Sequence, residues 1–255
     1  MAFDRKKFKV LHNKRIAKDV YCLELLGDTR AIKCPGQFVN IEVASYYLRR
    51  PMSIADWKLG DETTGKLIII YKVVGGGTAE MAKIAPGEFL DLLVPLGNGF
   101  DINVDTTHPL IVGGGVGTPP LIALAAQLIA CGKIPQVVLG FQSEEDVFAV
   151  DTFQKMHPEV TVHVATVDGT LGTKGFVTHV MEHLTYDYIF ACGPIPMLEA
   201  VVKMGGALPG QYSFEARMAC GFGACMGCSQ QTTTGYKRIC KEGPVLWKED
   251  LQWLI

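Results

Sequence analysis

Short apolar runs separated by turn residues occupy the chain from its start to about residue 100. Their lengths, and the Gly and Pro residues between them, predict strands joined by tight turns. Several short strands at regular spacing are typical of a small antiparallel barrel. One helix, from about residue 78 to residue 84, interrupts the pattern. The predicted strands lie at residues 20–25, 37–43, 67–74 and 89–94.

From about residue 108 the pattern alternates between apolar strands and helices. Such alternation indicates a parallel sheet with helices on both faces. We therefore expect a barrel domain at 1–103, an α/β domain at 104–213 and a small C-terminal unit at 214–255. The strands of the second domain are predicted at 109–112, 137–141, 161–166 and 188–191, and its helices at 121–131, 148–156, 177–183 and 197–203.

Composition narrows the class of protein. The 255 residues are enough for two domains and an appendage, and the net charge is −2 with no basic block, which makes nucleic acid and anionic membranes poor partners. The N-terminus lacks the apolar core of a signal peptide, and no apolar run reaches the length of a membrane span. Scattered single cysteines elsewhere in the chain suit a reducing compartment. We therefore expect a cytoplasmic protein.

The cysteines near the carboxyl end carry the strongest chemical signal. Four of the eight follow the spacing C-x4-C-x2-C-x11-C, with glycines that let a tight loop wrap a small object. The first three match the plant-type ferredoxin spacing, which favours a 2Fe-2S cluster. Zinc sites usually pair two C-x2-C knuckles and only one is present, so structural zinc is a weaker alternative, and two disulfides are weaker still. The candidate ligands are Cys220, Cys225, Cys228 and Cys240.

A glycine-rich turn between a predicted strand and a predicted helix is a candidate phosphate site. Glycines there let a pyrophosphate approach the backbone and the positive end of the helix. The pattern is not G-x-G-x-x-G, and a tight turn without a ligand is an open alternative. The candidate residues are Gly113, Gly114, Gly115, Gly117 and Thr118.

Two stretches of the barrel domain also offer anion-binding groups. The stretch Arg50-Pro51-Met52-Ser53 combines a guanidinium, a proline of fixed φ and a hydroxyl, which could hold a phosphate and the polar edge of a ring. The alternative is a surface charge pair at a strand start. Gly77 and Thr78 end a glycine run before a helix, where free N–H groups could bind a second phosphate; a flexible hairpin end is the alternative.

Two further features of the α/β domain are ambiguous. Cys192 follows a predicted strand, and strand ends in open α/β sheets face the ligand crevice, so its thiol could lie beside a reacting ring. A buried small residue is an equal alternative. His179 and His183 share one helix face, but no third ligand is near in sequence, so a polar helix face is favoured over a metal site.

Together these motifs resemble the ferredoxin–NADP reductase superfamily and, within it, the electron-transfer subunits of type B dihydroorotate dehydrogenase. The resemblance covers essentially the whole chain. Beside the motifs above it rests on Cys192-Gly193-Pro194 and, most specifically, on residues 215–228 with Cys240 a short way on. It implies a six-stranded antiparallel FAD-binding barrel, a parallel α/β NAD-binding domain and a small 2Fe-2S cluster subdomain.

The resemblance also assigns residues to the cofactors. FAD would lie across the barrel, and NAD over the glycine turn after residue 112 with its ring near the flavin and Cys192. The run Gln-Ser-Glu-Glu-Asp at 142–146 would repel a 2′-phosphate, so NAD is expected rather than NADP. The implied FAD contacts are Arg50, Pro51, Met52, Ser53, Ile70, Tyr71, Lys72, Gly77 and Thr78.

The implied function is a relay in pyrimidine biosynthesis. A partner subunit bearing FMN would oxidise dihydroorotate to orotate, and electrons would pass singly through the cluster to FAD and then as a hydride to NAD⁺. A heterotetramer with two copies of each subunit is implied, with Phe222 and Met226 at the interface. No catalytic residue for dihydroorotate is identifiable in this chain. The alternatives are a reductase subunit serving a hydrogenase or sulfite reductase, and a non-redox scaffold that holds zinc.

Overall fold

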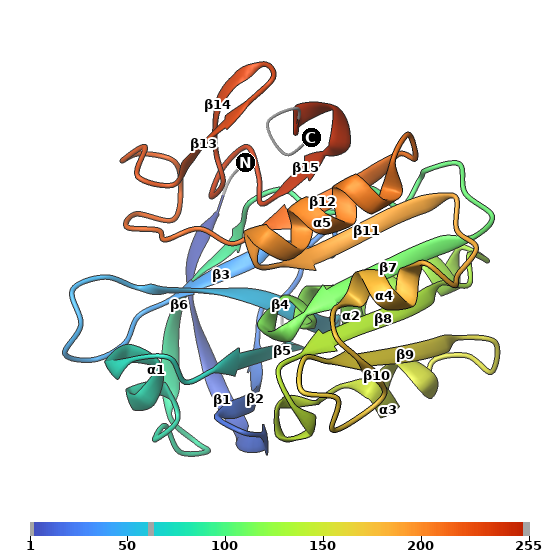
Figure 1. Ribbon diagram of the computed structural model, residues 1–255. Coiled ribbons are helices and arrows are strands. Elements are labelled where there is room, and N and C mark those ends of the chain that lie inside the picture. Colours follow the sequence, from blue (N-terminus) through green and yellow to red (C-terminus); the bar gives the residue numbers. More distant parts are fainter. Residues whose placement is uncertain (1–2, 61–63, 252–255) are drawn as a thin grey trace.

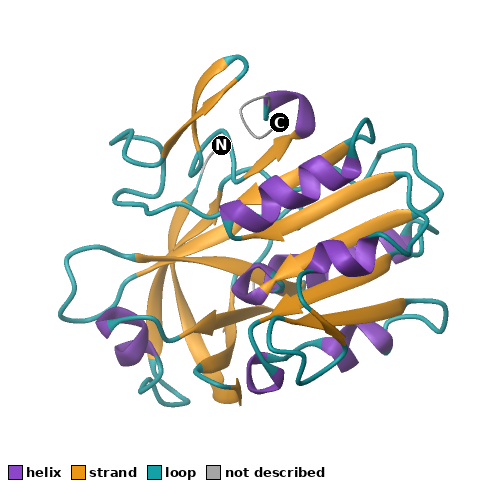
Figure 2. Cartoon of the chain, in the orientation of Figure 1, coloured by secondary structure: helices purple, strands orange, loops and turns teal. Residues whose placement is uncertain are grey.

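The computed structural model describes residues 3–60 and 64–251 (Figure 1). Its N-terminal part is a closed antiparallel barrel with strand order β1-β2-β5-β4-β3-β6, which packs beside a seven-stranded sheet (Figure 2). The predicted barrel is thereby confirmed. Its elements are β1 (Asp4–Ala17), β2 (Val20–Gly27), β3 (Phe38–Ile41), β4 (Arg50–Lys58), β5 (Gly65–Lys72), α1 (Gly76–Met81) and β6 (Phe89–Leu96).

Alternating side chains build the barrel core. In β5, Leu67, Ile69 and Tyr71 are buried in the barrel interior, while the residues between them are partly buried or exposed and face outward. β1 was not visible as an apolar run because only Phe8 and Val10 of its residues are buried and basic residues surround them. Its pairing with both β2 and β6 is what closes the barrel.

The second sheet has the order β10-β9-β8-β7-β11-β12-β15, and its strands are parallel except that β15 runs antiparallel to β12. The alternation of strand and helix seen in the sequence is therefore confirmed. The elements are β7 (Pro109–Gly114), α2 (Pro119–Ala130), β8 (Gln136–Phe141), α3 (Val150–Gln154), β9 (Thr161–Thr166), β10 (Thr173–Lys174), α4 (Val177–Met181), β11 (Tyr188–Gly193), α5 (Ile195–Gly205), β12 (Gly210–Phe214) and β15 (Val245–Trp247).

Helices cover both faces of this sheet. Residues of α4 and α5, among them Val180 and Leu198, pack in one hydrophobic cluster, and residues of α2 and α3, among them Leu124 and Phe153, pack in another (Figure 1). The second cluster also contains Ala55 from β4 of the barrel. Barrel and sheet therefore share buried apolar surface, which fixes one against the other.

The cysteine segment leaves the sheet and returns to it. After β12 the chain forms a hairpin of β13 (Ser229–Thr232) and β14 (Gly235–Arg238) and comes back as β15. Cys228 and Cys240 are buried in the same cluster as Phe214 of β12 and Phe38 of the barrel strand β3. The cysteines thus sit where the barrel meets the sheet. Within the described residues, no helix has the length and apolar character needed to cross a membrane.

Candidate functional site

The four predicted ligand cysteines come together, and their sulfur atoms form two pairs. The thiols of Cys220 and Cys225 are within hydrogen-bonding reach of each other, and so are those of Cys228 and Cys240. The Cys240 N–H also donates to Cys228 Sγ at 3.4 Å. Cys228 and Cys240 are buried, Cys220 is partly buried and Cys225 is exposed. The site therefore has an inner pair and an outer pair.

Backbone N–H groups point at the outer pair. The Ala224 N–H donates to Cys220 Sγ at 3.3 Å. Burial raises the pKa of Cys220, but this N–H group and those of Phe222 and Cys225 outweigh it and lower the pKa to about 6. Burial and the neighbouring thiol raise the pKa of Cys240 to about 12. The loop thus already favours a thiolate at Cys220, the form that binds metal.

The paired arrangement fits a binuclear cluster better than a single ion. Each iron of a 2Fe-2S centre with four cysteines takes two thiolates. A structural zinc needs four ligands that converge on one point. The two thiol pairs, Cys220 with Cys225 and Cys228 with Cys240, match the division that a two-iron centre requires. N–H donors to sulfur are also the groups that stabilise such clusters, so the residues present fit a 2Fe-2S centre.

Two contacts hold the loop in shape. Gly221 has a φ of +76°, which favours glycine, and a Cβ there would lie 2.3 Å from Asn40 Nδ2 on the barrel. The carbonyl of Gly223 accepts a hydrogen bond from Arg238 Nη1 at 2.6 Å, and Arg238 forms an ion pair with Glu242. The loop is therefore fixed from the barrel side and from β14.

The two barrel stretches predicted to bind phosphate lie side by side. The Arg50 guanidinium at the start of β4 is so close to α1 that a Cβ on Gly77 would be 2.1 Å from Arg50 Nε. Tyr46, which the sequence did not single out, stacks under this guanidinium, with Arg50 Cζ 4.7 Å from the ring centre. Thr78 Oγ1 accepts two backbone N–H groups of the preceding turn, at 2.9 and 3.2 Å. Glycine backbone and a guanidinium thus form one cradle suited to an anion.

The other predicted FAD contacts lie on β4 and β5, and they differ in whether their side chains face outward, where a ligand could reach them. Ile70 and Lys72 face outward, whereas Tyr71 points into the barrel core and its hydroxyl donates to Asn13 Oδ1 at 3.1 Å. Only the backbone of Tyr71 is therefore available to a ligand on the outer surface. The remaining predicted contacts, on β4, are partly buried: Pro51, Met52 and Ser53.

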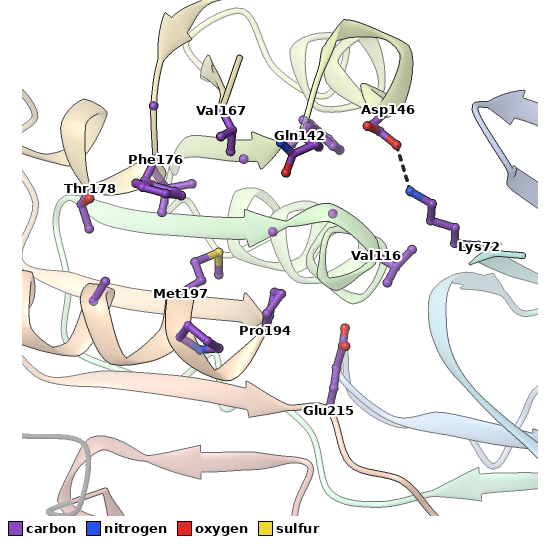
Figure 3. A pocket seen from close by; sticks show the side chains of 18 of the residues that line it. Lys72, Val116, Gln142, Asp146, Val167, Phe176, Thr178, Pro194, Met197 and Glu215 are labelled. Carbon is purple, nitrogen blue, oxygen red and sulfur yellow. Dashed lines mark hydrogen bonds and ion pairs between the residues drawn. The ribbon is translucent and has the colours of Figure 1, made fainter. Parts of the chain in front are cut away.

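A cavity of about 590 Å³ opens at the carboxyl ends of the sheet strands (Figure 3). Its size and its place outside the strand ends suit a nucleotide. Gly114 and Gly115 line it where β7 passes into the short helix η1 (Gly115–Gly117). A Cβ on Gly117 would lie 2.3 Å from the carbonyl oxygen of Cys192, so this glycine permits close packing behind the cavity. Gly113 and Thr118, two further residues of the predicted phosphate site, are buried and do not line the cavity.

Glu215 lines the cavity, and Cys192 interacts electrostatically with it without lining the cavity. Cys192 is buried beside the lining, and burial, with the Glu215 carboxylate, holds the pKa of its thiol far above the ordinary value. Glu215 follows β12 and lines the cavity (Figure 3). It is exposed toward this space, yet enough protein surrounds it that burial raises the pKa of its carboxyl. In the sequence Glu215 opens the stretch 215–228 on which the family resemblance rests, but no role is assigned to it there.

The acidic turn after β8 is partly neutralised by the barrel. Asp146, in the helical turn η2 (Glu144–Asp146), lines the cavity and pairs with Lys72 Nζ at 2.9 Å (Figure 3). Glu145 pairs with Lys18 Nζ at 2.9 Å. Among the described residues Glu144 takes part in no ion pair. The repulsion of a 2′-phosphate is therefore weaker than three free carboxylates would give.

The two histidines of the predicted helix face have separate surroundings. His179 Nδ1 accepts the N–H of Phe176 at 3.2 Å, at the start of α4, and a Cβ on Gly175 would lie 2.2 Å from the same atom. His183 follows the end of α4. His179 therefore serves as a local cap, which matches the interpretation of a polar helix face. Phe176 itself lines the cavity and, being apolar, gave no signal in the sequence (Figure 3).

The chain is similar to known proteins in its cysteine segment, along its whole sequence and in its fold. The iron–sulfur cluster binding domain of dihydroorotate dehydrogenase B matches residues 215–252. The electron transfer subunit of dihydroorotate dehydrogenase B (NAD⁺) from Fusobacterium nucleatum is 40% identical over 95% of this chain and 96% of its own length. The corresponding subunit from a Geobacillus species is 41% identical over 94% and 96%. The structure of the NADH-dependent reduced ferredoxin–NADP oxidoreductase, described for flavin-based electron bifurcation, covers 96% of this chain and 90% of its own with a TM-score of 0.84 and 28% identity.

Proposed function

This chain belongs to the family of electron transfer subunits of NAD⁺-dependent dihydroorotate dehydrogenase B, and from this premise we propose that it passes electrons from a dihydroorotate-oxidising partner to NAD⁺. The observation that carries the proposal is the pair of cysteine pairs seated between the barrel and the sheet. Cys228 and Cys240 are buried at this position, while Cys225 is exposed at the surface, where a partner could exchange electrons with the site.

The cofactors are FAD, a 2Fe-2S cluster and NAD. When bound, the cluster exchanges single electrons and FAD converts them into the hydride that NAD⁺ accepts. The four cysteines would hold the cluster. Arg50, Gly77 and Thr78 would hold the phosphates of FAD on the barrel, 1–103, with the remaining β4 and β5 residues along the flavin. The α/β part, 104–213, would bind NAD, and residues 214–255 would form the cluster subdomain.

The cavity is the proposed NAD site. The glycine backbone at Gly114 and Gly115 leaves room for a pyrophosphate beside the start of α2. Asp146 is placed to accept a hydrogen bond from a ribose hydroxyl, which suits NAD better than NADP. Lys72, which pairs with Asp146, reaches from the barrel strand proposed to lie along the flavin. The two nucleotides would thus meet at the inner end of the cavity, near Glu215.

A partner subunit completes the proposal. The name of the family implies a separate catalytic subunit, and we propose that this subunit carries FMN and assembles with the chain as a heterotetramer of two copies each. Phe222 and Met226 on the cysteine loop are 40% and 52% exposed. Exposed apolar side chains that lie together often mark a protein–protein interface, which supports their place at the contact with the partner subunit. Phe3 stacks on Phe222 at 5.3 Å and widens this apolar surface.

The test is isolation of the native complex under anaerobic conditions. We expect an FMN-bearing subunit to co-purify and the complex to form NADH from NAD⁺ when dihydroorotate is added. Co-purification with a hydrogenase or a sulfite reductase subunit, without dihydroorotate-dependent NADH formation, would point to another reductase of the same fold. A colourless protein that contains zinc would contradict the proposal.

A further inference from the structure

Asn40 of β3 joins the barrel to the cysteine loop. Its side chain is 1% exposed, and Nδ2 donates to the carbonyl oxygen of Cys220 at 3.2 Å. Because a carbonyl can only accept, this contact fixes which end of the amide faces the loop. The other end, Oδ1, is buried and has no hydrogen-bond donor within the described ranges 3–60 and 64–251.

The backbone around Asn40 is held firmly. Arg49 Nη1 donates to the Asn40 carbonyl at 3.3 Å and to the Asp91 carbonyl at 3.0 Å. On the loop side, a Cβ on Gly221 would lie 2.3 Å from Asn40 Nδ2, so the loop approaches to backbone contact. The amide is therefore clamped between the strand and the loop and has little freedom to turn elsewhere.

The register of the sheet places Asn40 between the two proposed redox sites. Asn40 pairs with Pro51 across β3 and β4, and Pro51 belongs to the stretch proposed to hold the flavin. Its side chain reaches in the other direction to Cys220, a proposed cluster ligand. A single residue thus spans the gap between the barrel strand and the cluster loop.

The other end of the Asn40 amide is enclosed by protein. Its Oδ1 atom is buried and has no donor among the described residues, and a buried polar atom without a partner is costly. The Nδ2 hydrogen bond to the Cys220 carbonyl is therefore the polar contact that this side chain makes with the cysteine loop.

We propose that Asn40 is a positioning residue that fixes the cluster loop at the flavin strand and thereby sets the rate of electron transfer between the cluster and FAD. This inference rests on the proposed function, since it takes those two groups as the ones that bind. Asn40 does not itself react: it holds the Cys220 backbone in place through one hydrogen bond.

The test compares two asparagines that dock the same C-terminal segment. Asn40→Leu keeps the approximate volume and removes both donor and acceptor. The matched control is Asn98→Leu, because Asn98 Nδ2 donates to the carbonyls of Glu242 and Val245 at 3.0 and 2.7 Å, and Oδ1 accepts from the Val245 N–H at 2.9 Å. Asn98 therefore docks the segment without contacting a cysteine.

The holoprotein is mixed with NADH, and flavin reduction and cluster reduction are followed separately by rapid-mixing absorbance, with the EPR spectrum of the reduced cluster as a second readout. Asn40→Leu is expected to leave flavin reduction and iron content unchanged. It is expected to slow cluster reduction about fivefold, as loss of one net hydrogen bond implies, and to alter the EPR line shape. Asn98→Leu is expected to lower thermal stability and leave cluster reduction unchanged.

Unchanged cluster reduction in Asn40→Leu, or equal slowing in both variants, would overturn the inference. If the leucine variant does not load its cofactors, Asn40→Ser, which is small and polar but too short to reach the Cys220 carbonyl, is expected to show the same selective slowing, and its absence counts against Asn40. A wild-type protein that lacks iron or flavin would instead contradict the proposed function, so the two failures are distinguishable.

Discussion

At the scale of single residues, the proposed FAD site depends on the close approach of Arg50 to Gly77. Gly77→Ala would place a Cβ 2.1 Å from Arg50 Nε, so the guanidinium must leave the cradle. We expect FAD affinity to fall at least about tenfold, the value of one charge-assisted hydrogen bond, in fluorescence titrations of the apoprotein. The control is Gly75→Ala, because Gly75 has an extended φ of −178° and nothing lies within 4 Å of its Cβ position. Equal loss of affinity in both variants would contradict the assignment.

The sequence predicts the site residues that lie close together along the chain. It does not predict those whose role depends on the folded structure. The four cysteines are recognisable because their spacing alone defines a loop around a small object. Asn40 lies 180 residues before Cys220, whose carbonyl it contacts, so no local pattern could reveal it. Tyr46 and Glu215 lie near Arg50 and the cysteine loop in sequence, but their residue types are common and no spacing rule gives them a role. Tyr71 was placed along the flavin, but the strand alternation turns its side chain into the barrel core.

Among the elements, we propose that the acidic turn after β8 contributes to the choice of nucleotide. Asp146→Asn removes a carboxylate that lines the cavity and releases Lys72 from its ion pair. The ratio of kcat/KM for NADPH to that for NADH is expected to rise about fivefold, which is the effect of one unit charge in a largely solvated site. Glu145→Gln is the control, because Glu145 pairs with Lys18 outside the cavity lining, and its ratio is expected to stay the same. An unchanged ratio in Asp146→Asn would remove Asp146 from nucleotide selection.

Asp187, directly before β11, holds the segment that leads into β7. Its carboxylate accepts the N–H groups of Thr107 and His108 at 2.8 and 3.1 Å and also accepts from the Thr106 hydroxyl. Burial raises the pKa of Asp187, but these donors outweigh it and hold the pKa below its ordinary 3.8. Because the folded pKa is depressed, the stabilisation is complete above about pH 4 and is lost as the pH falls further.

Asp187→Asn should therefore lower the free energy of unfolding by about 1 kcal/mol near neutral pH, a modest value because the carboxylate is partly exposed. The difference between wild type and variant should shrink below pH 3.8, as the wild-type group is protonated. Denaturant titrations at several pH values measure it. Asp151→Asn, which only breaks an exposed ion pair with Lys155, should change little. A difference that stays constant with pH would contradict this account.

The predictable elements were those that bury one clear face. β2, β5, β8, β9 and β11 follow apolar runs, and the helices follow the alternation with them. β1 and β4 carry charged residues among their apolar ones, and each pairs with a barrel strand on both sides. β15 is a short strand that pairs with β12. Tertiary pairing, rather than local preference, forms these three strands.

The molecule as a whole brings three sites to one junction. The barrel carries the anion cradle, the sheet carries the cavity, and the C-terminal segment returns to the sheet so that its cysteines lie against the barrel strand β3. Under the proposed function, this arrangement would bring a one-electron centre, a flavin and a nicotinamide nucleotide next to one another. The exposed apolar residues of the cysteine loop then face outward, where a partner subunit can dock.

The central claim is that the four cysteines hold a 2Fe-2S cluster beside a flavin site, and metal analysis tests it most directly. Iron, acid-labile sulfide and flavin are measured in anaerobically purified protein and in its Cys225→Ala variant. The account predicts about two irons and two sulfides per chain in the wild type, and loss of the iron with retention of FAD in the variant. A wild-type chain that contains zinc and no iron, or a variant that keeps its full iron content, would contradict it.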